Sequence, residues 1–239
     1  MVINDGKDTT TRDLLHNNSF PFRTRYREIN HPLDGFGLCM ARNLGLETAQ
    51  GDLICYLDDD NALRPAFVST IMHWFEQHPC YFGLLPQQWR RRDVIRDGQV
   101  VKTGKSFISP QTGDTIADLI AQQSLFDSNG FTHQQQGVPL WNPDYRIFCD
   151  YEFFLQCVAG DQKIGLTSQV LVDYVQTSEG EIGRSNYRQW SQELLQIYIN
   201  RFTYAGIAEG WADWIPQAIQ KYQDKAQVQI SGFRESAHS

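Results

Sequence analysis

The fold is decided by residues 41–65, which read ARNLGLETAQGDLICYLDDDNALRP. Residues 41–49 have the apolar spacing of a short helix. The five apolar residues at 53–57 then predict a strand buried on both faces, as in a parallel sheet. Pro65 opens a second helix, in which apolar side chains recur at helical spacing from 67 to 75. This order predicts an α/β sheet, and such sheets bind ligands beyond the carboxyl ends of their strands.

Three adjacent carboxylates, Asp58, Asp59 and Asp60, follow the predicted strand. They repel one another, so the cluster costs free energy unless a positive charge lies among them. A divalent cation fits, because hard oxygen ligands suit Mg²⁺ and Mn²⁺, and one or two carboxylates suffice when substrate phosphates supply the other ligands. The alternative is a solvated acidic loop in which Asp60 or Asn61 caps the following helix.

Two further aspartates stand at the ends of predicted elements. Asp150 begins a predicted helix over 150–159, where it is either the N-cap residue or a general base kept ionised by the helix dipole. Asp5 lies at the turn after a predicted strand that starts at Val2, where an ordinary Asp-Gly turn is the alternative.

The remaining segments give a coarser picture. Residues 81–113 read as strands and loops, with a hairpin turn predicted at Asp97-Gly98 and a solvated strand end predicted at 90–92. Residues 187–222 predict an aromatic-rich helical region that is interrupted near Gly206 and Pro216. Three tryptophans in this region could pack on the core, on a partner or on a membrane surface: Trp190, Trp211 and Trp214.

Composition excludes several classes of protein. The 239 residues are 41% hydrophobic and 21% charged, which excludes disordered and fibrous chains. The net charge of −7 argues against a nucleic-acid-binding protein, because phosphate contacts need a basic surface. We expect no transmembrane segment and no signal peptide, because the chain has neither a long apolar run nor a basic start. The five cysteines are odd in number and lack metal-site spacing, which predicts a reducing, cytoplasmic location.

Together these segments resemble glycosyltransferase family 2, whose members are nucleotide-sugar-dependent enzymes of the GT-A fold. The resemblance covers about residues 1–175, and the 41–65 block is its most specific part. The other matching segments are VINDGKDT at 2–9, FDSNGFTH at 126–133, WNPDYR at 141–146 and CDYEFFL at 149–155. It implies an α/β, GT-A-type (Rossmann-like), mostly parallel sheet flanked by helices, with a C-terminal helical appendage. We therefore expect a glycosyltransferase-like domain over 1–180 and a helical region with a tail over 181–239.

The chain departs from the family pattern in two places. The family's Glu-Asp pair is Cys149-Asp150 here, although the aspartate usually assigned as the base is present. The first strand and helix of the family also have no counterpart, because the similarity starts at the second strand. A sheet without that strand would expose two strand edges.

The resemblance implies a role for each candidate residue. Asp150 would be the base that deprotonates an acceptor hydroxyl, and Asp60 would hold Mn²⁺ or Mg²⁺ at the donor diphosphate. Two residues are candidates for the acceptor side, although His133 could simply be an exposed or hydrogen-bonded histidine and Trp141 a packing residue. Four residues would bind the nucleotide-sugar: Asp5 at the base, Asp59 at the ribose or the metal, and with them Arg42 and Asp58.

The implied reaction is transfer of a glycosyl group from a nucleotide-diphosphate sugar, such as a UDP-sugar, to a hydroxyl of a saccharide or polysaccharide precursor. The anomeric configuration would invert. The alternative is a non-catalytic relic or regulatory domain that keeps the fold without donor binding. The implied partners are the donor and a saccharide or lipid-linked acceptor, and a homo-oligomer or peripheral contact with the inner face of the membrane is compatible with the sequence.

Overall fold

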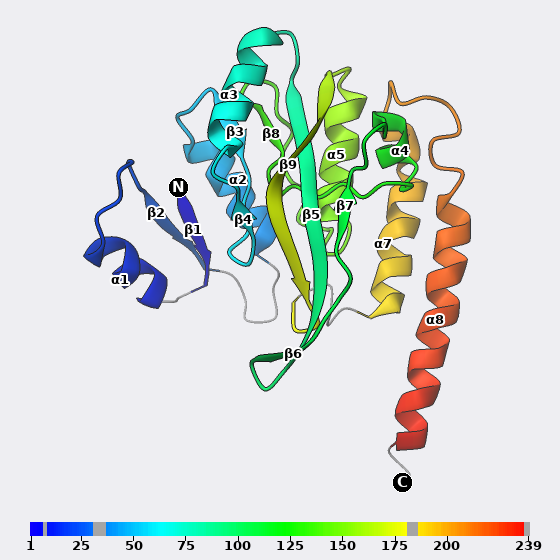
Figure 1. The fold of residues 1–239 in the computed structure, drawn as a ribbon. Coiled ribbons are helices and arrows are strands. Elements are labelled where there is room, and N and C mark those ends of the chain that lie inside the picture. The colour runs from blue at the N-terminus through cyan, green and yellow to red at the C-terminus, as the bar shows by residue number, and fades with distance from the viewer. Residues whose placement is uncertain (7–8, 31–36, 181–185, 237–239) are drawn as a thin grey trace.

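The structure is a computed structural model that describes residues 1–6, 9–30, 37–180 and 186–236. Its helices are α1 (Thr9–Asn17), α2 (Leu38–Thr48), α3 (Phe67–Gln77), α4 (Ile116–Ile120), α5 (Cys149–Ala159), α7 (Tyr187–Ile199), the 3₁₀ helix η1 (Arg201–Thr203) and α8 (Ile215–Ser236). Its strands are β1 (Val2–Asp5), β2 (Tyr26–Ile29), β3 (Leu53–Cys55), β4 (Ala62–Leu63), β5 (Gly83–Arg96), β6 (Gln99–Thr103), β7 (Phe107–Ser109), β8 (Thr132–Gln134) and β9 (Ile164–Thr177). Figure 1 shows β5 and β9 as the long strands at the centre.

The described strands form two sheets. In the larger one the order is β3-β8-β5-β9-β4, with β6 and β7 also paired to β5. Alternate side chains of β5 point to opposite faces: Leu84 packs with α3 residues such as Ile71, whereas Leu85 packs with α5 residues such as Phe153. Helices therefore cover both faces of this sheet, which confirms the expected α/β class.

The direction of the strands differs from the expectation. In the larger sheet β5 and β9 pair in parallel, but β3, β4, β6, β7 and β8 all run antiparallel to a neighbour. The buried strand expected at 53–57 is also shorter, because β3 ends at Cys55 and leaves Leu57 about half exposed. The reason is its position, since β3 lies at one end of the sheet and pairs with β8 on one side.

The smaller sheet consists of β1 and β2, which pair in parallel from Val2↔Tyr26 to Asp5↔Ile29. It lies beside α2 in Figure 1. The Asp5 carboxylate accepts a hydrogen bond from the Gly37 amide at 3.1 Å, and Ile3 packs close to Gly45 of α2. The strand expected at the N-terminus is thus present as β1 and attaches to the start of α2, whereas the turn expected after it reaches residues 7–8, which lie outside the described residues.

Other local expectations are confirmed. The hairpin turn is at Asp97-Gly98, with φ of 52° and 72°, which joins β5 to β6. Positive φ at both central residues explains why an Asp-Gly pair occupies this turn.

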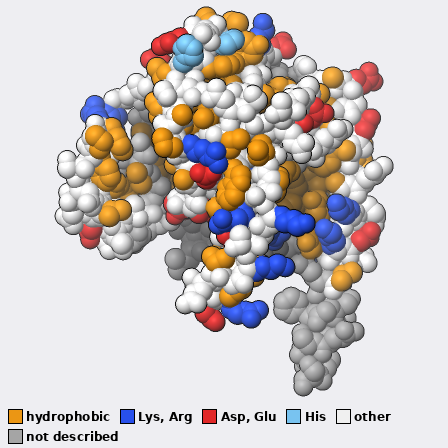
Figure 2. Space-filling model, viewed as in Figure 1, with side chains coloured by type: hydrophobic (Ala, Val, Ile, Leu, Met, Phe, Trp, Pro, Cys, Tyr) orange, Lys and Arg blue, Asp and Glu red, His pale blue; other side chains and the backbone are white. Residues whose placement is uncertain are grey.

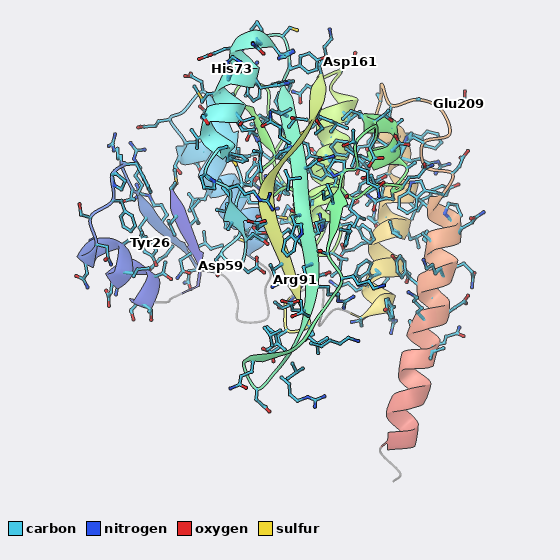
Figure 3. The ribbon with its side chains drawn as sticks, in the orientation of Figure 1. Tyr26, Asp59, His73, Arg91, Asp161 and Glu209 are labelled. Atoms are coloured by element: carbon cyan, nitrogen blue, oxygen red, sulfur yellow. The ribbon has the colours of Figure 1, made fainter. Side chains whose placement is uncertain are left out.

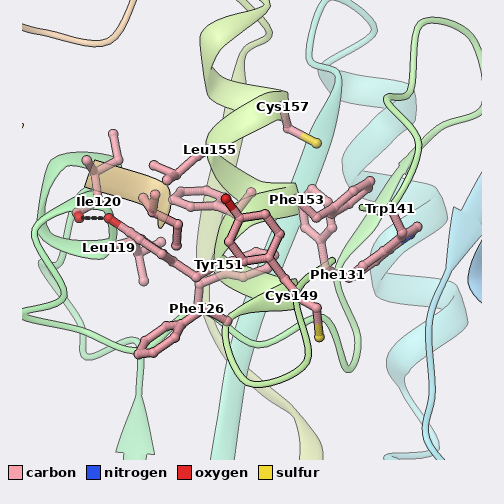
Figure 4. Packing of buried hydrophobic residues seen from close by; sticks show 14 of the residues in the cluster. Leu119, Ile120, Phe126, Phe131, Trp141, Cys149, Tyr151, Phe153, Leu155 and Cys157 are labelled. Atoms are coloured by element: carbon pink, nitrogen blue, oxygen red, sulfur yellow. Dashed lines mark hydrogen bonds between the residues drawn. The ribbon is translucent and has the colours of Figure 1, made fainter. Parts of the chain in front are cut away.

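The main core is aromatic and centres on α5 (Figure 4). Phe153, Phe154 and Leu155 expose none of their surface. The rings of Trp141 and Phe153 stack at 4.0 Å, and the Tyr151 hydroxyl donates a hydrogen bond to the Ile120 carbonyl at 2.5 Å. This packing fixes the orientation of α5, and so of Asp150 in its first turn.

The C-terminal helices pack on the same core. Glu193 of α7 accepts hydrogen bonds from the backbone amides of Ile147 and Phe148 at 2.8 and 2.9 Å. Ile197 and Ile215 are fully buried. Residues on both sides of residue 180 therefore contribute to one hydrophobic cluster. The interruption expected near Gly206 and Pro216 is confirmed, because residues 204–214 separate η1 from α8, and Pro216 lies in the first turn of α8, where proline is tolerated.

None of the described helices is both long and apolar enough to cross a membrane.

Candidate active site

The three adjacent aspartates follow β3 along the chain. Asp59, the middle one, lies toward the lower end of the sheet in Figure 3. Asn129, in the turn before β8, holds Asp58 in place. The Asp58 amide donates to the Asn129 side-chain oxygen at 2.7 Å, and the Asn129 amide group donates to Asp58 Oδ2 at 2.9 Å. This two-point contact fixes the start of the acidic loop.

Arg42 of α2 joins the acidic loop to α5. Its guanidinium donates from Nη1 to Asp150 Oδ1 at 2.7 Å and from Nη2 to Asp58 Oδ1 at 2.9 Å. The side chain is 6% exposed and lies 4.2 Å from the centroid of the Trp141 ring. Burial alone would lower the pKa of Arg42, but Asp150 and then Asp58 raise it above its ordinary value. Arg42 is therefore a permanent cation that brings two candidate site carboxylates together.

Asp150 lies in the first turn of α5, but it is not the capping residue. The N-cap position is Phe148, and no side chain caps the helix there. Arg42 occupies Oδ1, and no hydrogen bond among the described residues reaches Oδ2. The side chain is 25% exposed. The structure therefore leaves one oxygen of an oriented carboxylate to receive a proton.

Asp59 and Asp60 have the donor chemistry for a divalent cation. Desolvation, followed by repulsion from Asp58 and Asp59, raises the pKa of Asp60 to about 6. A bound cation would relieve that repulsion. Both oxygens of Asp58 accept hydrogen bonds, whereas Asp60 accepts one from the Asn61 side chain at 2.7 Å on Oδ1 only, so Asp59 and Asp60 have more acceptor positions left for a metal. No group of three or more ligand residues converges among the residues that the structure describes. The carboxylate oxygens of Asp59 and Asp60 are ligands of the kind that Mg²⁺ and Mn²⁺ prefer.

We expect Asp60→Asn to stabilise the metal-free chain at pH 8 and to have little effect near pH 3.5. Because the folded chain binds this proton more tightly than the unfolded chain, the free energy of unfolding falls as pH rises from about 4 to about 6. The gain at pH 8 is about 1 kcal/mol or less, since solvent screens part of the repulsion. Urea unfolding in a chelating buffer measures it, with the exposed Asp144→Asn as the control. Equal gains for both variants would contradict the assigned repulsion.

A second polar layer lies behind Asp58. Buried Asp127 accepts hydrogen bonds from the Asn129 backbone and side-chain amides at 2.9 and 3.0 Å. Arg90, which stacks on Tyr174 at 3.9 Å, lies 3.9 Å from the same carboxylate. The strand end predicted to be solvated at 90–92 is thus buried at Arg90. We expected residues 126–133 on the acceptor side. Instead, Asn129 binds Asp58 directly, and Asp127 binds Asn129.

The two acceptor-side candidates are core residues. His133 exposes none of its surface and Trp141 exposes 1%, so an acceptor could not touch either side chain. The Tyr56 hydroxyl forms a hydrogen bond with the His133 ring at 2.8 Å and accepts one from the Trp141 indole at 3.2 Å. Burial lowers the pKa of His133 to about 4, so it is neutral at pH 7. Trp141 and Tyr56 lie against the Arg42 guanidinium, whereas His133 packs on Tyr56.

Sequence comparison identifies the family of the chain. The family model of glycosyl transferase family 2 matches residues 1–131, more than half of the chain. The chain belongs to glycosyl transferase family 2. No curated protein matches the chain.

Comparison of structures shows the fold of this family 2 chain. The crystal structure of residues 1–349 of S. aureus TarS in complex with UDP-GlcNAc has a TM-score of 0.62 and 12% sequence identity, covering 93% of this chain and 62% of that one. The crystal structure of S. aureus TarS has a TM-score of 0.59 and 12% identity, covering 92% of this chain and 37% of that one. This chain thus spans about three fifths of the 1–349 structure. The likeness confirms the expected GT-A-type fold.

Proposed function

We propose that this chain transfers a glycosyl group from a nucleotide-diphosphate sugar, such as a UDP-sugar, to a hydroxyl of a saccharide or polysaccharide precursor. Family membership supports glycosyl transfer from a nucleotide-sugar. The observation that carries the finer proposal is the Arg42 bridge between Asp58 and Asp150. It puts a candidate base next to the loop with metal-binding chemistry, as a transfer between donor and acceptor requires.

The residues then have distinct roles. Asp150 would accept the proton of the acceptor hydroxyl at Oδ2 while Arg42 orients it through Oδ1. The acceptor oxygen bonds to the anomeric carbon as the bond from that carbon to the diphosphate breaks, and the electron pair leaves with the diphosphate. Attack from the face opposite the leaving group inverts the configuration. Asp5, at the end of β1, would accept a hydrogen bond from the nucleotide base.

The acidic loop would bind the donor diphosphate together with a Mg²⁺ or Mn²⁺ ion held by Asp59 and Asp60. The ion supplies positive charge next to the negative charge that develops on the leaving diphosphate. Asp58 would not be a ligand but a fixed anchor for the loop, because Arg42 and Asn129 occupy its oxygens.

We expect calorimetric titration with UDP to show micromolar binding in the presence of Mn²⁺ and much weaker binding in a chelating buffer. The physical reason is that the acidic loop repels the diphosphate unless a cation lies between them. Asp60→Asn should weaken the Mn²⁺-dependent binding, and Asp144→Asn should not. Absence of binding to a cooperatively folded chain in both buffers would contradict the proposal and favour a non-catalytic domain of the same fold.

A further inference from the structure

The feature that the proposed reaction leaves unused is a two-stranded hairpin at the lower end of the sheet in Figure 1, where β5 continues into β6. We call residues 92–108 the basic hairpin. Every residue of β6 is exposed. From Arg91 to the turn at Asp97 the strand extends about 20 Å at 3.3 Å per residue.

Apolar side chains lie uncovered along the basic hairpin. Val100 is 55% exposed, Val101 53% and Phe107 49%, and Val94 and Ile108 are each 39% exposed. Exposed β-branched side chains on a free strand edge favour contact with another surface. Each of these side chains is far more exposed than the buried residues of the core.

The charge of the basic hairpin is opposite to that of the whole chain. Four cationic residues are exposed in it, whereas the exposed acidic residue is Asp97 at the turn. Asp93 is buried and paired with Arg91 at 2.8 Å. The chain as a whole carries −7. In Figure 2 blue side chains gather around this end of the sheet with orange ones between them. The four exposed cationic residues are Arg92, Arg96, Lys102 and Lys105.

We propose that the basic hairpin docks the protein on an anionic membrane. Lysine and arginine are attracted to anionic headgroups, and valine and phenylalanine enter the boundary between headgroups and acyl chains. A soluble polyanion would use the cations but would leave the apolar side chains in water. The combination therefore favours a lipid surface.

The docking surface begins next to the candidate active site. The Val175 amide of β9 donates to the Asn61 side chain at 3.0 Å, directly after the acidic loop, and Val175 pairs with Arg91 of β5. Figure 3 shows Asp59 and Arg91 at the same end of the sheet. A membrane at the basic hairpin would thus lie near the acidic loop. If the proposed transfer is correct, this position favours a lipid-linked acceptor.

Sedimentation with vesicles tests the proposal without any donor or turnover. We expect binding to vesicles of phosphatidylcholine mixed with phosphatidylglycerol, little binding to phosphatidylcholine alone, and loss of binding at high salt. Arg96→Gln/Lys102→Gln and, separately, Val100→Ser/Val101→Ser should each lower the partition coefficient about tenfold or more. The matched controls are Arg188→Gln/Lys221→Gln on α7 and α8, and Val68→Ser/Met72→Ser on the exposed side of α3.

Three results would overturn the proposal. The first is equal binding by the hairpin variants and the controls, and the second is no binding to anionic vesicles. The third is binding that the valine variant retains and that soluble polyphosphate displaces, which would assign the hairpin to polyanions. UDP titration of the same variants separates the membrane proposal from the proposed function. A chain can lose UDP binding and keep vesicle binding, or lose vesicle binding and keep UDP binding.

Discussion

Asp150→Asn is expected to lower kcat for glycosyl transfer about 10³-fold while leaving the affinity for UDP with Mn²⁺ nearly unchanged. Asparagine keeps the shape of the side chain and an oxygen that can accept the hydrogen bond from Arg42, but it cannot take a proton from the acceptor. General-base catalysis contributes about 10²–10⁴ in rate. Initial rates and calorimetry on the same protein samples measure the two effects.

The control for this variant is Asp144→Asn, which removes an exposed carboxylate in the loop before α5. It should retain the turnover of the unmodified chain. An Asp150→Asn variant with more than about a tenth of normal kcat would contradict the role of Asp150 as base, given the size of that effect. A variant that also loses UDP binding would instead indicate that Asp150 contributes to the donor site.

Arg42→Met is expected to lower the free energy of unfolding by about 3 kcal/mol and to abolish transfer. The substitution leaves Asp58 and Asp150 without their shared cation and removes a guanidinium that stacks on Trp141. Removing one partner of a buried ion pair costs about 3–5 kcal/mol, and the partial exposure of both carboxylates places this site at the lower end. Denaturant unfolding followed by tryptophan fluorescence measures the loss.

Arg42→Lys is the matched variant, because it keeps the charge but cannot donate to both carboxylates in the planar geometry of arginine. We expect its free energy of unfolding to fall by about half as much as that of Arg42→Met. The reason is that lysine loses one of the two charged hydrogen bonds, and each contributes about 1.5–3 kcal/mol. If the methionine variant is as stable as the lysine variant, the bridge does not hold α2 against α5, and the assigned role of Arg42 is wrong.

The sequence identified the candidate residues of the site but not the contacts that hold them. The acidic loop and Asp150 follow from residue type and position at the ends of predicted elements. Arg42 was expected among the nucleotide-sugar-binding residues, yet the structure gives it two carboxylate partners, one of them 108 positions away. That contact depends on how α2 and α5 pack on the sheet, which no local pattern encodes.

The residues behind the site were missed for the same reason. Asn129 reaches Asp58 only because β8 lies beside β3, a pairing that brings together segments about 80 residues apart. An isolated histidine gives no sequence signal of burial, so the interior position of His133 could not be foreseen. Strand direction was also not predictable, because an apolar run is equally compatible with parallel and antiparallel neighbours.

The separate sheet of β1 and β2 has a consequence for local stability. Four residue pairs join β1 to β2, whereas eleven residue pairs join β5 to β9. Opening β1 and β2 therefore breaks few hydrogen bonds, so we expect their amides to exchange with solvent at a lower free energy of opening than those of the central strands. Asp5 is carried by this less protected unit. If Asp5 and Asp150 have the proposed roles, nucleotide recognition depends on this small sheet, whereas proton transfer depends on α5, which packs in the main core.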